Sequence, residues 1–204
     1  MATETELKLC IAPEAVAALL QHPRLTAQPI QRHLRNTYFD TDDLALTRQK
    51  VAVRERLVDG QTLLTVKTAG QSQDGLSHRN EWEAPTQPGR FDFVSLIDDA
   101  ALASTLATLA DLLVPVFTTD FERLIWRVTV DDSDVEVALD RGLIQVQRDG
   151  QQGQTPICEL ELELKSGDEK ALATLAAELQ ATTILTPTDE SKAARGYALF
   201  HALA

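Results

Sequence analysis

The stretch that decides the fold is Cys158-Glu159-Leu160-Glu161-Leu162-Glu163-Leu164-Lys165. Its charged and apolar side chains alternate at every position, which is the period of a β-strand with one polar and one apolar face. Near the other end of the chain, Thr3-Glu4-Thr5-Glu6-Leu7-Lys8-Leu9 repeats the pattern. Two strands far apart in the sequence therefore each present a row of carboxylates that ends in a lysine.

Further strands are expected between these two segments, at 33–39, 50–58, 62–69, 78–84, 121–130, 134–140 and 143–148. Asp-Gly pairs at 59–60, 74–75 and 149–150 mark turns. Helices are expected at 14–20, 98–112 and 170–180, the third opened by a capping box that starts at Ser166. A last helix is expected to open at Thr186-Pro187-Thr188-Asp189 and to run through Lys192 to about His201. Eight or nine mostly antiparallel strands with a few helices indicate the α+β class.

The charged faces of these strands are sorted by sign. Arg54 and Arg56 share one face, whereas the carboxylates of the row at 159–163 stand about 6–7 Å apart and repel one another. One interpretation is that every polar face points to water, as in a half-exposed sheet. Alternatively, a sheet that packs its apolar face on helices and closes into a barrel turns the charges inward. Such a lumen suits a polyphosphate that carries Mg²⁺ or Mn²⁺, since arginine and lysine bind phosphates and carboxylates bind hard cations.

A family resemblance supports the inward arrangement. The motif Glu4-x-Glu6-x-Lys8 resembles the ExExK signature of the CYTH superfamily, the triphosphate tunnel metalloenzymes. The resemblance continues through 36–41, 53–56, 64–68, 79–83, 159–165 and 191–195, and so covers essentially the whole chain. The chain is similar above all to the CYTH domain of bacterial inorganic triphosphatases. In many of those proteins a CHAD domain follows the CYTH domain. Residues 1–204 are therefore expected to form a single CYTH domain, either a stand-alone member or the first domain of a longer protein.

The resemblance implies an eight-stranded antiparallel closed β-tunnel with flanking helices. It also implies metal-dependent hydrolysis of inorganic triphosphate to diphosphate and phosphate, with two Mg²⁺ or Mn²⁺ ions per site. The implied metal ligands are Glu4, Glu6, Glu159, Glu161, Glu163 and Asp140. The implied triphosphate contacts are Lys8, Arg54, Arg56, Lys67, Arg123, Lys165 and Lys192. The catalytic set is Glu4, Glu6, Lys8, Glu161 and Glu163.

Several alternatives stay open on the sequence. The same fold also suits a thiamine or nucleoside triphosphatase or a class IV adenylate cyclase, and family members often have a lysine where this chain has Phe121. A binding module could hold polyphosphate without cutting it. The remaining alternative is an acidic α+β domain whose charged strands face solvent.

Composition limits the class of partner. The chain has 31 acidic and 19 basic residues, a net charge of −12, which argues against binding nucleic acid or an anionic membrane. No segment approaches the roughly 18 uninterrupted apolar residues of a membrane span, and residues 1–6 lack a signal-peptide pattern. A cytoplasmic location is expected, where Cys10 and Cys158, which fall on different kinds of strand face, stay reduced. The oligomeric state is not predicted.

Overall fold

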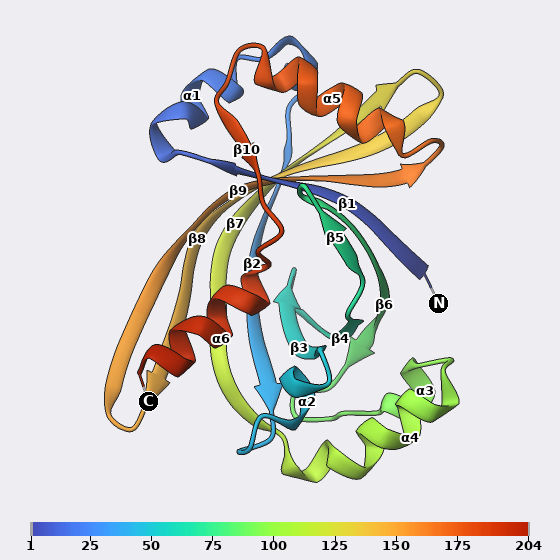
Figure 1. Ribbon diagram of the computed structural model, residues 1–204, viewed down its shortest axis with the longest axis vertical. Coiled ribbons are helices and arrows are strands. Elements are labelled where there is room, and N and C mark those ends of the chain that lie inside the picture. The colour runs from blue at the N-terminus through green and yellow to red at the C-terminus, as the bar shows by residue number, and fades with distance from the viewer. Residues whose placement is uncertain (1, 204) are drawn as a thin grey trace.

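The computed structural model describes residues 2–203, in which eight antiparallel strands close into a barrel (Figure 1). Around the barrel the order is β1-β9-β8-β7-β2-β3-β4-β6, and β6 pairs with β1 to close it. The strands are β1 (Ala2–Ile11), β2 (Ile30–Asp40), β3 (Val51–Val58), β4 (Gln61–Thr68), β6 (Leu76–Thr86), β7 (Val114–Val130), β8 (Ser133–Arg148) and β9 (Gln151–Ser166). Two short strands, β5 (Gln71–Gln73) on β6 and β10 (Leu185–Pro187) on β1, extend the sheet. The expected eight-stranded closed tunnel is confirmed.

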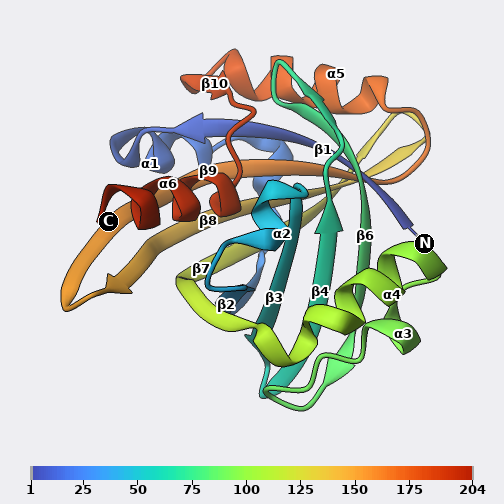
Figure 2. The same cartoon turned by 60° about the horizontal axis from the view of Figure 1, so that its bottom comes forward.

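Six α-helices in residues 2–203 surround the barrel (Figures 1 and 2). They are α1 (Val16–Leu19), α2 (Ala45–Arg48), α3 (Phe93–Leu96), α4 (Ala100–Leu109), α5 (Lys170–Gln180) and α6 (Lys192–Ala202). Figure 1 shows α1 and α5 at one end of the molecule and α3 and α4 at the other, with α6 beside the barrel. Three short 3-10 turns, Pro13–Ala15, Pro23–Leu25 and Ala110–Leu112, complete the helical elements.

The apolar faces of the strands point outward against these helices. Leu160 and Leu162 of β9 are fully buried in one cluster with Leu175 of α5. On the opposite side, α4 packs on the outer face of β3 and β4 in a second cluster. Each such leucine contributes about 1.5–3 kcal/mol when it leaves water. The charged faces consequently turn inward, and Glu6, Lys8 and Glu161 are buried, so the solvent-facing interpretation of the strands is wrong.

Gly142 explains why two expected strands, 134–140 and 143–148, are one continuous strand, β8. A Cβ atom at this glycine would lie 2.1 Å from the carbonyl oxygen of Asp120 and 2.5 Å from Cα of Phe121. The glycine therefore permits a close approach of β7 and does not end the strand.

Helix starts were the least accurate expectation. Ser166 is the last residue of β9, and the amide of Lys170 at the start of α5 donates to Asp168 instead, so no capping box forms. Thr186 and Pro187 belong to β10, and α6 begins at Lys192 with Ser191 as its cap. The segments 14–20 and 98–112 are each divided into a 3-10 turn and an α-helix, and α2 and α3 were not expected.

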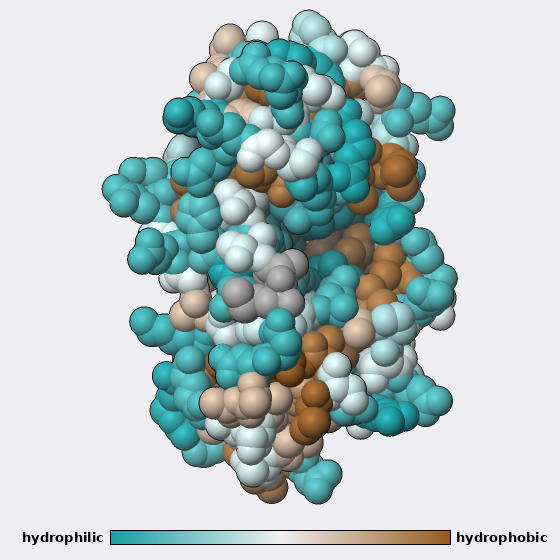
Figure 3. All heavy atoms as spheres, turned by 90° about the vertical axis from the view of Figure 1, so that its right-hand side faces the viewer, coloured by the Kyte–Doolittle hydropathy of each residue, from teal (hydrophilic) through white to brown (hydrophobic). Residues whose placement is uncertain are grey.

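The surface of the protein is mainly polar on the face that Figure 3 shows, where hydrophilic residues cover most of the area and apolar residues form scattered patches. No helix within residues 2–203 combines the length and apolar character of a membrane span. Both cysteines carry free thiols.

Candidate active site in the barrel lumen

The lumen holds a cavity of about 830 Å³ that is lined mainly by charged side chains. Its ten basic residues are Lys8, Arg32, Lys50, Arg54, Arg56, Lys67, Arg79, Arg123, Lys165 and Lys192, and its eight acidic residues are Glu4, Glu6, Glu81, Glu83, Glu136, Glu161, Glu163 and Asp189. Basic groups thus outnumber acidic ones here, although the protein as a whole is strongly acidic. The cavity is therefore a local site for an anion.

The two arginines of β3 have few close acceptors. Arg54 donates to the hydroxyl of Tyr38 at 3.3 Å, its nearest carboxylates lie 3.7 and 4.0 Å away, and its buried Nε has no hydrogen-bond partner. Arg56 donates to Oδ1 of Asn36 at 2.9 Å, and the carboxylate of Glu83 lies 3.8 Å away. Neither guanidinium forms the close two-point contact with a carboxylate that satisfies a buried arginine.

The pKa values of the two arginines shift in opposite directions. Burial, together with the positive charges of Arg54 and Arg123, lowers the pKa of Arg56 to about 10, because these effects outweigh the attraction of Glu83. The pKa of Arg54 is raised, since Tyr38, Glu81 and Glu83 outweigh its burial. The pKa of Tyr38 is also lowered, because the charge of Arg54 outweighs the opposing effect of burial.

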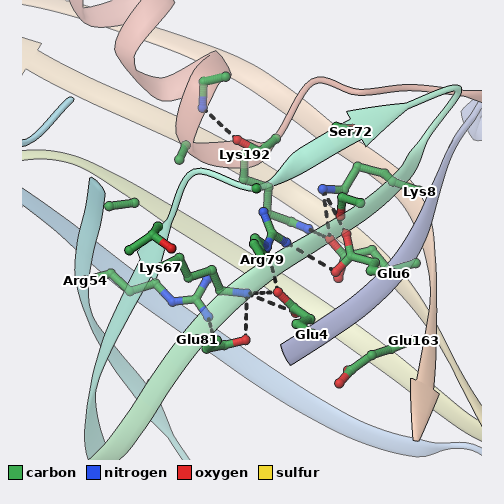
Figure 4. Close-up of a pocket in the computed structure, with 18 of the residues that line it drawn as sticks. Glu4, Glu6, Lys8, Arg54, Lys67, Ser72, Arg79, Glu81, Glu163 and Lys192 are labelled. Carbon is green, nitrogen blue, oxygen red and sulfur yellow. Dashed lines mark hydrogen bonds and ion pairs between the residues drawn. The ribbon is translucent and has the colours of Figure 1, made fainter. Parts of the chain in front are cut away.

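The carboxylates of β1 and β9 that line the cavity, Glu4, Glu6, Glu161 and Glu163, form its acidic end. Figure 4 shows Glu4 pointing at Lys67 and Arg79, which lie 2.9 and 2.6 Å from it. These cations hold the pKa of Glu4 far below its usual range in spite of burial. The neighbouring Glu6 differs, because its buried Oε1 accepts no hydrogen bond although the Lys8 ammonium lies 3.2 Å away.

Glu163 faces Glu6 across the β1–β9 pairing. Burial raises its pKa, an effect that Lys165 at 2.6 Å opposes and that the charges of Glu4 and Glu136 reinforce. The acidic end thus combines a buried carboxylate oxygen that accepts no hydrogen bond, on Glu6, with a carboxyl group whose charged form is disfavoured, on Glu163.

A third group of carboxylates surrounds Lys192. Ligand oxygens of Asp140, Glu159 and Glu161 all lie within 4.8 Å of one another, a spacing that could hold a metal ion. The Lys192 ammonium already contacts all three, at 2.6 Å from Asp140, 2.9 Å from Glu161 and in a short contact with Glu159. The three carboxylates raise the pKa of Lys192, while Lys192 and Arg123 hold the pKa of Glu161 well below its usual range, although burial opposes both shifts.

Most of the residues expected from the sequence meet in this one cavity. Its lining includes Glu4, Glu6, Lys8, Arg54, Arg56, Lys67, Arg123, Glu161, Glu163, Lys165 and Lys192. Asp140 and Glu159 lie behind the lining, 0% and 2% exposed, where they hold Lys192. Phe121 is also buried, with its ring centroid 5.1 Å from the Lys192 ammonium and 5.8 Å from the Arg123 guanidinium, so an aromatic face replaces the expected lysine.

Sequence reasoning missed several lining residues, above all Arg79, Glu81 and Glu83 of β6. The alternation of Arg79-Asn80-Glu81-Trp82-Glu83 carried the signal, since these three positions share one strand face. Their partners, which include Glu4 and Lys67, lie on strands that neighbour β6 only in the folded barrel.

Comparison with known proteins fixes the family. The model of the CYTH domain matches residues 2–197. The chain belongs to the CYTH family. As a CYTH domain it is 36% identical, over 98% of its length, to an inorganic triphosphatase of Haemophilus influenzae. The match covers 55% of that relative, so the chain spans about half of its length.

Solved structures share the CYTH fold at low sequence identity. A Hippeastrum protein described as an adenylyl cyclase with dominant triphosphatase activity has a TM-score of 0.66 at 19% identity, covering 98% of this chain and 95% of its own. A Bacillus halodurans protein described as a candidate adenylate cyclase has a TM-score of 0.57 at 20% identity, covering 96% and 98%. At such identities these likenesses establish the fold alone.

Proposed function

We propose that this CYTH domain hydrolyses inorganic triphosphate to diphosphate and phosphate with the aid of a divalent metal ion. One observation carries the proposal: a single cavity contains two arginines whose nearest carboxylate oxygens are 3.7 and 3.8 Å away, and a buried carboxylate oxygen, Oε1 of Glu6, that accepts no hydrogen bond. A metal-bound polyphosphate supplies both partners at once. The sequence relationship to the Haemophilus influenzae triphosphatase supports the choice of triphosphate.

Basic side chains from several strands would hold the substrate. Arg54, whose buried Nε has no hydrogen-bond partner, and Arg56 are the first of these, and Lys8, Lys67, Arg123, Lys165 and Lys192 complete the proposed set of contacts. Fixed positive charges stabilise the charge that develops on the leaving diphosphate. The protein thereby orients the triphosphate and lowers the barrier mainly by electrostatics.

The acidic end fits a hard divalent cation. Glu4, Glu6, Glu161 and Glu163 would hold it, because they line the cavity and Oε1 of Glu6 is unpartnered. When bound, Mg²⁺ or Mn²⁺ would neutralise phosphate charge and lower the pKa of a bound water. For Asp140 and Glu159 we propose a different role, which is to fix the ammonium of Lys192; that they bind metal stays a prediction from sequence, as does a following CHAD domain.

The test is a phosphate-release assay on triphosphate, ATP and thiamine triphosphate, each with Mg²⁺, Mn²⁺ or Ca²⁺. We expect release from triphosphate to be fastest and to disappear in Glu6→Gln. Glu122→Gln, an exposed glutamate of β7, is the control and should retain full activity. Preference for a nucleoside or thiamine ester, or cyclic nucleotide formation, would assign one of the other enzymes of this fold. Tight binding without release would leave a polyphosphate-binding module.

A further inference from the structure

The inference concerns the last helix, α6, which carries one of the proposed substrate contacts. Most cations of the cavity project from barrel strands, whose positions the sheet fixes, whereas Lys192 is the first residue of α6. Figure 4 shows Lys192 reaching from this helix toward the cavity. The position of its ammonium therefore depends on how α6 is attached to the barrel.

Much of that attachment is apolar and has little directional preference. Gly196 lies against the ring of Phe117, where a Cβ atom would come within 2.2 Å of a ring carbon. Tyr197 packs edge-on against the same ring, with centroids 5.2 Å apart, and Arg148 lies over Phe200 at 4.3 Å. Polar contacts add to these, since Arg148 donates to the carbonyl oxygen of Phe200 at 3.0 Å and the Arg195 guanidinium lies 3.3 Å from Glu159 of β9.

One buried hydrogen bond restricts rotation on the cavity side. The hydroxyl of Tyr197 donates to Oδ2 of Asp40 at 2.9 Å, and the two residues are 8% and 0% exposed. Asp40 is itself fixed, because its carboxylate accepts from the amides of Thr41, Leu46 and Thr47 at 2.8, 2.8 and 2.9 Å. The Tyr197 hydroxyl therefore donates to a carboxylate that is fixed to other elements and would not move together with α6.

Lys192 and Tyr197 hold α6 on different sides. Five residues separate them, which is about 7.5 Å along the axis and about 140° around it. Lys192 contacts carboxylates of β8 and β9, whereas Tyr197 reaches the end of β2 and the start of α2. A rotation of α6 that breaks the Tyr197 contact would also move the ammonium at the other anchor.

We propose that Tyr197 is a positioning residue for the triphosphate site, acting through its hydrogen bond to Asp40 to place the Lys192 ammonium. This role rests on the proposed function in so far as Lys192 contacts triphosphate. The same bond joins the helix that carries Lys192 to α2, which leads into the strand that carries Arg54 and Arg56. It therefore sets the relative position of cations on two elements that no sheet pairing connects.

The test is a double-mutant cycle on the whole chain, with inorganic triphosphate as the probe and a chelator present so that no turnover occurs. Tyr197→Phe keeps the aromatic ring that packs on Phe117 but removes the hydroxyl. We expect triphosphate binding, measured by calorimetry, to weaken about fivefold, which is the effect of losing one hydrogen bond. In the Lys192→Met background the same change should cost less than about twofold, since coupled residues are not additive. Ser133→Ala, which removes the hydrogen bond that the Ser133 hydroxyl accepts from the amide of Asp168, is the control and should leave affinity unchanged. Equal weakening in both backgrounds, or none, would overturn the proposal.

A second measurement separates this role from the proposed function. Tyr197→Phe should shift the nitrogen resonance of the Lys192 ammonium and speed hydrogen exchange of the α6 amides, while Ser133→Ala should do neither. If the wild-type protein binds no triphosphate but these shifts occur, the proposed function is wrong and the positioning of Lys192 by Tyr197 stands. If the Lys192 resonance does not move, the positioning role is wrong whatever the binding data show.

Discussion

Replacing Arg56 by methionine should stabilise the ligand-free protein and at the same time remove binding of triphosphate. The guanidinium is buried beside Arg54 and close to Arg123, and its nearest carboxylate oxygen is 3.8 Å away. Methionine fills a similar volume without the charge, and replacing a poorly compensated buried ion by an apolar side chain is often stabilising.

The pKa of Arg56 gives the magnitude. Burial and the two neighbouring arginines lower it from its ordinary value to about 10. At 1.36 kcal/mol per pH unit, keeping the charge costs the folded state about 3 kcal/mol. Because the folded pKa is the lower one, the whole cost is present below about pH 10 and is relieved as the pH rises above it. Methionine also forfeits the hydrogen bond to Asn36, about 1 kcal/mol, so we expect a net gain of about 1–2 kcal/mol at pH 7.

Arg123→Met is the matched control, because replacing this arginine by methionine should lower the free energy of unfolding instead of raising it. Arg123 donates to both oxygens of Asp140 at 2.7 and 2.6 Å and to Glu161 at 2.5 Å. Although burial opposes the shift, these carboxylates raise its pKa well above the ordinary value. Removing one partner of a buried ion pair typically costs about 3–5 kcal/mol.

Urea unfolding of both variants without ligand measures the free energy of unfolding, and the shift of Tm with triphosphate measures binding. The reasoning predicts a higher urea midpoint for Arg56→Met, a lower one for Arg123→Met, and no triphosphate-induced Tm shift in Arg56→Met. A loss of stability in Arg56→Met as large as that in Arg123→Met would refute the claim that the β3 arginines lack an anion.

Four further outcomes are expected. Glu6→Gln should lower Mg²⁺-dependent phosphate release by about 100-fold or more with an unchanged circular dichroism spectrum, and retained turnover would remove Glu6 from the ligand set. Mg²⁺ alone should raise the Tm of the wild-type protein, and Glu163→Gln should reduce that shift; equal shifts in both proteins would contradict the acidic end as the cation site. Glu4 has a lowered folded pKa, so its contribution to stability is present above pH 4.5 and is lost as the pH falls; in acid titrations of urea midpoints, Glu4→Gln should therefore lose less stability than the wild type below pH 4.5. Glu163 has a raised pKa, so Glu163→Gln should be more stable than the wild type at pH 7, and a less stable variant would contradict that shift.

Much of the fold could be predicted from particular residues. The alternation at 3–9 and 158–165 identified two strands, and the repulsion within their carboxylate rows favoured the inward arrangement that the closed barrel has. The break expected near Gly142 was wrong. Sequence alone does not distinguish a glycine that lets a neighbouring strand come close from a glycine that ends the strand in which it lies. The start expected for the last helix was wrong because Thr186 and Pro187 pair with β1 instead.

The sequence by itself determined which side chains share a strand face, because a strand alternates its faces at every residue whatever surrounds it. Only the tertiary structure decided which charges are neutralised. Closing the barrel sets Glu4 beside Arg79 of β6, and packing α6 on its flank brings Lys192 among three carboxylates, while Arg54 and Arg56 have no carboxylate oxygen nearer than 3.7 Å. The strength of each charge pair depends on distances between elements far apart in the chain, and those distances follow from strand register and helix packing, not from local spacing.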